Sequence, residues 1–376
     1  MDFGLSEEQG ELRGLAKQIL ADMTGAAALR EVEAGDGTHR ILWAALGEAG
    51  LLGLGLPEEV GGLGMGDFAD VCLLLEQVGR HVAPIPALES LVMGALPLAE
   101  FGTPEQRAAA DLEGVIAGRS VLTGAFLEAG ASDPLRPGTR AEADGDGWRL
   151  YGTKATVPSL PAARRVLLTA RLDDGRLAVF LVDPSAPGAT VQAGTGTHDL
   201  PLGALVLDGV SVGVSDVLGG IDRGDEVARW VVERAHVGLC ALALGLAGKA
   251  LHITAKYVSE RKQFGVPLGT FQAVSQRAGD GWIDVESIRL VVQRAGWLLA
   301  AGREACKEVA VARIITGDAA HRVACSAIHL HGGIGFDRDY PLYRYFLWTK
   351  HLEFLLGSTS AQVARLGDRL AEEARA

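Results

Sequence analysis

The hydrophobic period of the chain changes twice, and these changes constrain its fold more than any single motif. Up to about residue 118, apolar residues recur at the three- and four-residue spacing of helices. From about residue 120 to 220, short runs rich in Val, Leu and Thr alternate with turn signals, as strands do. Helical spacing then returns and continues to the end. We therefore expect an α+β protein with an all-α domain over 1–118, a β-domain over 119–222 and a helical bundle over 223–376.

Local signals support this division. Ser6 and Gln9 have the spacing of a capping box, and Thr103-Pro104 gives a cap followed by proline at the first helical position. Asp144-Gly145 predicts a hairpin turn, because glycine tolerates the positive φ that tight turns require. The expected second strand of this hairpin is 148–154.

The last third of the chain predicts long, closely packed helices. The run 227–258 contains no proline and carries small residues that allow neighbouring helices to approach: Gly238, Ala241, Ala243, Gly245 and Ala247. Further helices are expected over 272–300, 306–330 and 341–376.

Composition excludes several classes of partner. The net charge is −12, which argues against general binding to nucleic acid or to an anionic membrane, since both need a basic surface. No run reaches eighteen uninterrupted apolar residues and the first five residues lack a basic region, so we expect no membrane insertion and no signal peptide. The cysteines lack CxxC spacing and predict reduced core thiols in a cytoplasmic protein: Cys72, Cys240, Cys306 and Cys325.

A basic, aromatic, glycine-containing segment interrupts the helical pattern at 260–272. Arg261 offers a planar fork suited to phosphate and Phe264 offers a ring face, while Gly265 and the following proline separate two helices. The alternative interpretation is a solvated turn between helices.

The sequence Arg-Lys-Gln-Phe-Gly at 261–265, followed by Phe-Gln at 271–272, resembles the RxxFG…Q motif of the acyl-CoA dehydrogenase family. The segment His-Leu-His-Gly-Gly-Ile-Gly-Phe at 329–336 is similar to the QxxGGxG(F/Y) motif of the same family. The resemblance covers essentially the whole chain. It implies a helical domain, a middle β-barrel and a C-terminal four-helix bundle.

The resemblance also implies an activity, α,β-dehydrogenation of an acyl-CoA thioester with FAD as cofactor, and a dimer of dimers that passes electrons to electron-transfer flavoprotein. It places six residues against the pyrophosphate end of a neighbouring chain's FAD: Arg261, Phe264, Gln272, His329, Gly332 and Gly333. His329 stands where the family usually has glutamine, and it keeps a hydrogen-bond donor. Residues two apart do not share a helix face, so we expect no metal at His329 and His331.

The catalytic base that the resemblance implies is missing. Counting from Gly332, Leu356 occupies the usual position of the glutamate, and counting back from Arg261, Ala235 occupies the known alternative position. The carboxylates nearest to these positions are Glu226, Glu233 and Glu353, and Glu233 is the candidate base among them.

The β-domain departs from the family as well. Residues 127–133 read Leu-Glu-Ala-Gly-Ala-Ser-Asp where the family has TEPGxGSD, and Thr156-Val157-Pro158 replaces a W-(I/V)-(T/S) triplet. Pro158 has no N–H for the flavin ring. These losses resemble the non-catalytic-type subunit of bacterial heteromeric acyl-CoA dehydrogenases, in which a second related chain brings the base and the substrates are bulky, steroid side chains included. The alternatives are a self-sufficient homotetramer with a relocated base and a non-redox scaffold.

Overall fold

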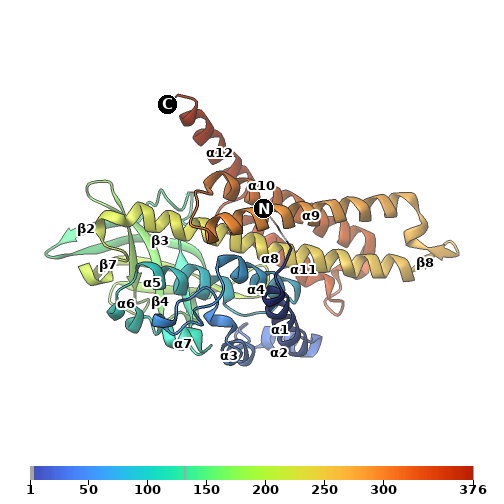
Figure 1. Ribbon diagram of the computed structural model, residues 1–376, viewed down its shortest axis with the longest axis horizontal. Coiled ribbons are helices and arrows are strands. Elements are labelled where there is room, and N and C mark those ends of the chain that lie inside the picture. Colours follow the sequence, from blue (N-terminus) through green and yellow to red (C-terminus); the bar gives the residue numbers. More distant parts are fainter. Residues whose placement is uncertain (1–3, 131–132, 376) are drawn as a thin grey trace. The chain divides into compact units, whose positions relative to one another are not determined.

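The computed structural model describes residues 4–130 and 133–375, which form two compact units (Figure 1). The helical unit comprises the residues up to Leu29, Cys72–Ala83 and the residues from Leu239 onward. The mixed unit comprises Arg30–Val71 and Pro84–Gly238. The expected order of helices, strands and helices along the chain is confirmed.

Helices occupy the first third of the chain, and α1 and α6 begin at the caps that the sequence predicts. The Ser6 hydroxyl accepts the Gln9 N–H at 3.2 Å, and Gln9 reciprocates, which starts α1 (Glu7–Met23). Thr103 and Gln106 form the same box at the start of α6 (Pro104–Ala109). The other elements are α2 (Ala26–Ala34), α3 (Arg40–Glu48), α4 (Phe68–Arg80), the π-helix η3 (Leu88–Ala95), α5 (Leu96–Phe101) and α7 (Leu112–Ile116), with 3-10 turns η1 (Leu51–Gly53) and η2 (Glu58–Val60).

The described strands of the mixed unit form one seven-stranded sheet, seen in Figure 1. Its order is β1-β4-β2-β3-β7-β6, with β5 paired to β4; β1 and β2 run parallel to β4 and the other pairs are antiparallel. Asp144 pairs with Gly147 across the predicted hairpin turn, and Gly145 has φ +61°. The strands are β1 (Leu122–Ala125), β2 (Arg140–Asp144), β3 (Gly147–Pro158), β4 (Arg165–Leu172), β5 (Leu177–Val182), β6 (Ala189–Thr195) and β7 (Pro201–Val212).

Long helices build the rest of the chain: α8 (Gly224–Glu260), α9 (Gln272–Ala300), α10 (Cys306–His331), α11 (Leu342–Phe354) and α12 (Thr359–Glu373). Within the helical unit α10 packs against α9, α11 and α12. Gly245, one of the small residues predicted to allow close approach, does so, because a Cβ there would lie 1.9 Å from the carbonyl oxygen of Glu76. Gly79 of α4, which the sequence analysis did not single out, is packed as closely, since its Cβ would lie 2.1 Å from the carbonyl oxygen of Leu242. The crossing of α4 and α8 therefore requires glycine on both helices.

The stretch Ile221–Glu260 has the length and mean hydropathy of a membrane-crossing helix, although its apolar run is interrupted. However, 72% of its most apolar window is buried against the protein. Such burial is typical of the core helix of a globular protein, since the same side chains cannot face lipid and core together.

Candidate functional site

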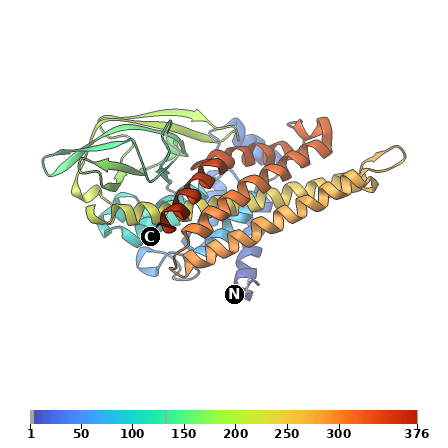
Figure 2. The ribbon, with the colours of Figure 1, turned by 90° about the horizontal axis from the view of Figure 1, so that it is seen from above.

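We use the term corner for residues 261–272 and 329–336, which all belong to the helical unit. The first half is a tight hairpin in which β8 (Lys262–Gln263) pairs with β9 (Val266–Pro267). Figure 2 shows this hairpin projecting beyond the helices that it joins. Phe264 and Gly265 turn it with φ of +55° and +85°, the signature of a type I′ turn.

Phe264 is strained and exposed at the same time. A left-handed conformation costs a non-glycine residue about 1 kcal/mol, and this ring is nevertheless 93% exposed. Among the described residues, the only aromatic ring that contacts the ring of Phe264 is that of Phe271, which it meets edge-on, and the two ring centroids are 6.2 Å apart. A side chain held in this way serves a ligand or partner better than it serves the core.

Arg261 and Gln272 stand at the base of the hairpin with exposed side chains. The Arg261 N–H donates to the carbonyl of Tyr257 at 2.8 Å, and the Arg261 carbonyl accepts from Leu268 N–H at 2.8 Å. The backbone is therefore fixed while the guanidinium stays accessible. Gln272 is the first residue of α9.

The second half of the corner follows α10 as the 3-10 turn η8 (Gly332–Phe336). Gly332 has φ +64° and ψ −142°, which only glycine adopts readily. A Cβ on Gly332 or Gly333 would meet nothing within 4 Å, so their backbone lies open to a ligand. Gly335 is closely packed instead, because its Cβ would lie 3.2 Å from the Cβ of His331.

Two contacts that the sequence did not predict connect the second half to the helices that flank the first. Arg277 of α9 donates through Nη1 to Nδ1 of His329 on α10, and the ring of Tyr257 on α8 stacks on His331 with centroids 4.2 Å apart. Both pairs are far apart in sequence, so no local signal could have revealed them. They place exposed cationic and N–H groups on one end of the helical unit, which suits an anionic ligand.

A groove of about 860 Å³ continues from His329 between α9 and α10. Its lining alternates in charge, with Arg277 and Arg322 beside Asp280 and Asp284. Cys325 lines it as well and is exposed, so the expectation that every cysteine is a core residue is wrong here; its apolar neighbours in sequence lie on the other face of α10.

The position of the missing base is filled by a buried leucine. Leu356 is 2% exposed and has φ +59° in the turn between α11 and α12. The buried Arg313 guanidinium holds this turn, since its Nη2 lies 3.3, 3.0 and 2.9 Å from the carbonyl oxygens of Leu352, Leu355 and Gly357. A cation and an aliphatic side chain therefore stand where the resemblance implies a carboxylate.

The carboxylates named as substitutes differ in their surroundings. Burial raises the pKa of Glu353, but Lys350 Nζ at 3.0 Å and His321 Nδ1 at 3.2 Å outweigh it and hold that pKa below its usual value. Glu226 is exposed, and its hydrogen bonds with Arg223 lower its pKa. Glu233 lies on α8 with a partly exposed side chain in the mixed unit, whereas Leu356 belongs to the helical unit.

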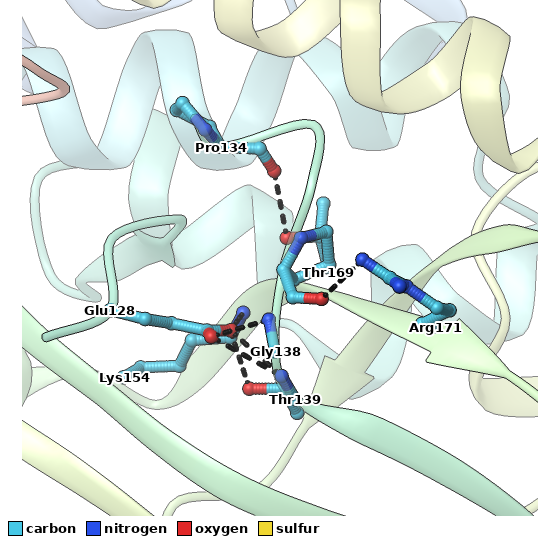
Figure 3. A network of polar contacts seen from close by, with 8 residues as sticks. Glu128, Pro134, Gly138, Thr139, Lys154, Thr169 and Arg171 are labelled. Carbon is cyan, nitrogen blue, oxygen red and sulfur yellow. Dashed lines mark hydrogen bonds and ion pairs between the residues drawn. The ribbon is translucent and has the colours of Figure 1, made fainter. Parts of the chain in front are cut away.

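The altered β-domain segment contains a buried ion pair (Figure 3). Lys154 is fully buried, and its Nζ lies 2.5 Å from Oε1 of Glu128. The same carboxylate accepts the N–H of Gly138 at 2.6 Å and the hydroxyl of Thr139 at 2.6 Å. Burial lowers the pKa of Lys154 to about 8, against the opposing effect of Glu128. Glu128 thus ties the start of the predicted flavin-facing segment to Gly138 and Thr139, and residues 131–132 of that segment lie outside the described residues.

Pro158 ends β3 opposite Leu202. Its carbonyl accepts the Thr123 hydroxyl at 2.6 Å, and two residues earlier Thr156 has φ +53° beside an irregularity in the ladder. Backbone groups of this triplet are therefore already used in contacts within the protein. Of the expected FAD contacts, those at the corner fit an anionic pyrophosphate, because they combine an exposed guanidinium with an open glycine backbone, whereas Pro158 offers the flavin ring no donor.

Family models match most of the chain. Residues 6–118 match the acyl-CoA dehydrogenase N-terminal domain, and residues 222–371 match the acyl-CoA dehydrogenase C-terminal domain. The chain is 37% identical to "Acyl-CoA dehydrogenase FadE27" of Mycobacterium tuberculosis, over 99% of each chain.

Two solved structures have the same fold over nearly the whole chain. A variant of the Tcur3481-Tcur3483 steroid ACAD is 44% identical with a TM-score of 0.91, covering 98% of this chain and 99% of that one. The ChsE4-ChsE5 complex from Mycobacterium tuberculosis is 37% identical with a TM-score of 0.92, covering 99% of both. These similarities confirm the architecture that the sequence predicts.

Proposed function

Because the chain belongs to the acyl-CoA dehydrogenase family, whose oxidoreductases use FAD, we propose that it works as one subunit of a heteromeric acyl-CoA dehydrogenase. Its partner is a related chain that carries the catalytic glutamate. The observation that supports this proposal is the contrast between the buried Leu356, held by a cationic side chain, and the exposed corner around Arg261.

FAD supplies the redox chemistry of such an enzyme by accepting a hydride from the β-carbon of the acyl-CoA. In this chain Arg261 and Gln272 would hold the pyrophosphate of a neighbouring subunit's FAD, and the backbone of Gly332 and Gly333 would approach it closely. Phe264 would cover the cofactor or the neighbouring chain from the tip of the hairpin. The α-proton is taken by the partner chain, since leucine cannot accept one.

The names of two similar structures guide the choice of partner and substrate. One is a complex of two differently named chains, and the other is named as a steroid ACAD with a two-part name. We accordingly assign this subunit a bulky, steroid-type acyl-CoA as substrate. Electron-transfer flavoprotein is the proposed acceptor and the cytoplasm the proposed location.

A second candidate is a self-sufficient homotetramer in which Glu233 is the base. It is favoured by the position of Glu233 on α8, two residues before Ala235, with a side chain that is partly exposed. Replacing Glu233 with Gln separates the two proposals. Turnover falls by orders of magnitude if Glu233 is the base and stays unchanged if the partner supplies it.

The proposal is tested by purifying the chain alone and together with a co-expressed homologue that has the family glutamate. We expect FAD only in the co-purified complex, and its loss in Arg261→Gln but not in Arg303→Gln, which changes an exposed arginine after the far end of α9. A yellow, active chain without a partner would support the homotetramer, and a complex that binds no FAD would leave the scaffold interpretation.

A further inference from the structure

A buried histidine lies in the second half of the corner. His331 is the last residue of α10, only 5% exposed, and Gly332 follows it directly. His329, two residues earlier, is exposed and faces Arg277. The two histidines of this motif therefore have different surroundings, and the resemblance gives His331 no role.

The hydrogen bonds of His331 fix its proton. Nδ1 lies 2.8 Å from the carbonyl oxygen of Ala327, and because a carbonyl only accepts, Nδ1 carries the hydrogen. Burial lowers the pKa of His331, with the Ala327 bond opposing it, so the ring is neutral at pH 7 and Nε2 is an acceptor. The hydroxyl of Tyr340, 3.1 Å away, donates to Nε2.

The ring faces of His331 complete the arrangement. Tyr257 stacks on it at 4.2 Å with an interplanar angle of 21°, and Tyr340 lies at 5.2 Å. We call Tyr257, His331 and Tyr340 the aromatic lock. The Tyr257 carbonyl accepts the Arg261 N–H, which links the lock to the first half of the corner. Gly335, whose Cβ would lie 3.2 Å from the Cβ of His331, packs the following turn closely against the base of the same side chain.

We infer that His331 is a positioning residue that fixes Arg261 relative to the Gly332–Phe336 turn, and so pre-organises the corner for the pyrophosphate of FAD. It acts through Tyr257 and Tyr340 and does not itself contact the cofactor. The inference rests on the proposed function, because the ligand of the corner is taken from it. Pre-organisation matters here because both halves are exposed and would otherwise lose conformational entropy when they become ordered on binding.

The test uses the purified holo-complex and two variants. His331→Phe keeps the stacked ring and removes both hydrogen bonds, while Tyr340→Phe removes a single hydroxyl and leaves folding least disturbed. His252→Phe, an exposed histidine on α8, is the matched control. FAD dissociation is measured by the fluorescence of released flavin, and amide hydrogen exchange is measured over 261–271 and 332–340.

We expect both lock variants to bind FAD about tenfold more weakly, as loss of a buried hydrogen bond implies, with turnover of the FAD-loaded fraction unchanged. Exchange should accelerate in both segments together, and the control should match the wild type. Unchanged FAD affinity and unchanged exchange in Tyr340→Phe and His331→Phe would overturn the inference. If exchange accelerates in the lock variants but Arg261→Gln retains FAD, the positioning role of His331 is supported, and the proposal that the corner binds FAD is refuted.

Discussion

Replacing Glu128 with Gln should destabilise the protein strongly at neutral pH. The change is nearly isosteric, so it removes the charge and leaves the shape. Lys154, which is fully buried, then has no counter-ion, because the Glu128 carboxylate 2.5 Å away is its ion-pair partner. Gly138 N–H donates to Oε2 and the Thr139 hydroxyl to Oε1, so the single amide oxygen of glutamine can keep only one of these acceptor positions, and the lost bond adds to the effect of the unpaired ammonium.

The magnitude follows from the cost of an uncompensated buried charge, which is about 3–5 kcal/mol in the free energy of unfolding. The pH dependence has a definite sign. Even when paired, Lys154 has a folded pKa of about 8, against 10.5 in the unfolded chain. Between these values the folded chain binds fewer protons, so stability rises with pH, by about 3 kcal/mol in total. Without Glu128 the pKa of Lys154 in the folded chain falls further, so the rise in stability with pH begins at a lower pH.

The assay is urea unfolding of the wild type, Glu128→Gln and the double variant Glu128→Gln/Lys154→Met, at pH 7 and at pH 9 and fixed protein concentration. The double variant should recover at least half of the loss, because no buried charge remains at positions 128 and 154. Glu142→Gln, in an exposed pair with Arg140, should change stability by less than about 0.5 kcal/mol. A loss below about 1 kcal/mol in Glu128→Gln, or an equal loss at both pH values, would refute the reasoning.

Three further predictions concern other parts of the chain. Burial raises the pKa of Glu89, in the π-helix η3, from 4.5 to about 7, so stability should fall as pH rises across that interval; Glu89→Gln should abolish this slope in thermal unfolding, and a slope that persists would assign it to another group. Arg313→Leu leaves three buried carbonyls without their donor and should cost about 2–4 kcal/mol in urea unfolding, whereas a neutral effect would show that the turn around Leu356 holds itself. Phe264→Ala should change stability of the isolated chain by less than about 0.5 kcal/mol, because the ring is 93% exposed, yet weaken assembly in analytical ultracentrifugation; unchanged assembly would remove the ring from the interface.

Local signals predicted the elements of this fold well. The capping boxes at Ser6 and Thr103, the Asp144-Gly145 turn and the glycines that allow α8 to pack closely each depend on residues near one another in sequence, and the structure has them. The break between α8 and α9 at the corner was also predicted, because the motif itself is contiguous, although the β8–β9 hairpin was not. The positive φ of Phe264 was not, since glycine is the residue that normally signals it.

The contacts that organise the candidate site could not be predicted, because they join distant parts of the chain. Arg277 and His329 are 52 residues apart, and Lys154 and Glu128 are 26 apart. From sequence alone, each of these side chains is equally compatible with a solvated surface. The packing of α9 on α10 determines the first pair, and the packing of the segment around Glu128 on β3 determines the second. The roles of the FAD-binding residues and of Glu233 remain predictions, whereas the family and its cofactor are established by similarity along the whole chain.

The central claim is that this chain helps to bind FAD but contributes no base. The most direct measurement is anaerobic bleaching of the flavin absorbance after mixing with a steroid-type acyl-CoA. It is made on the chain alone in the presence of added FAD, and on the complex with the glutamate-bearing homologue. The account predicts rapid bleaching in the complex, unaffected by Glu233→Gln in this chain, and none in the chain alone. Rapid bleaching of the chain alone, abolished by Glu233→Gln, would contradict it.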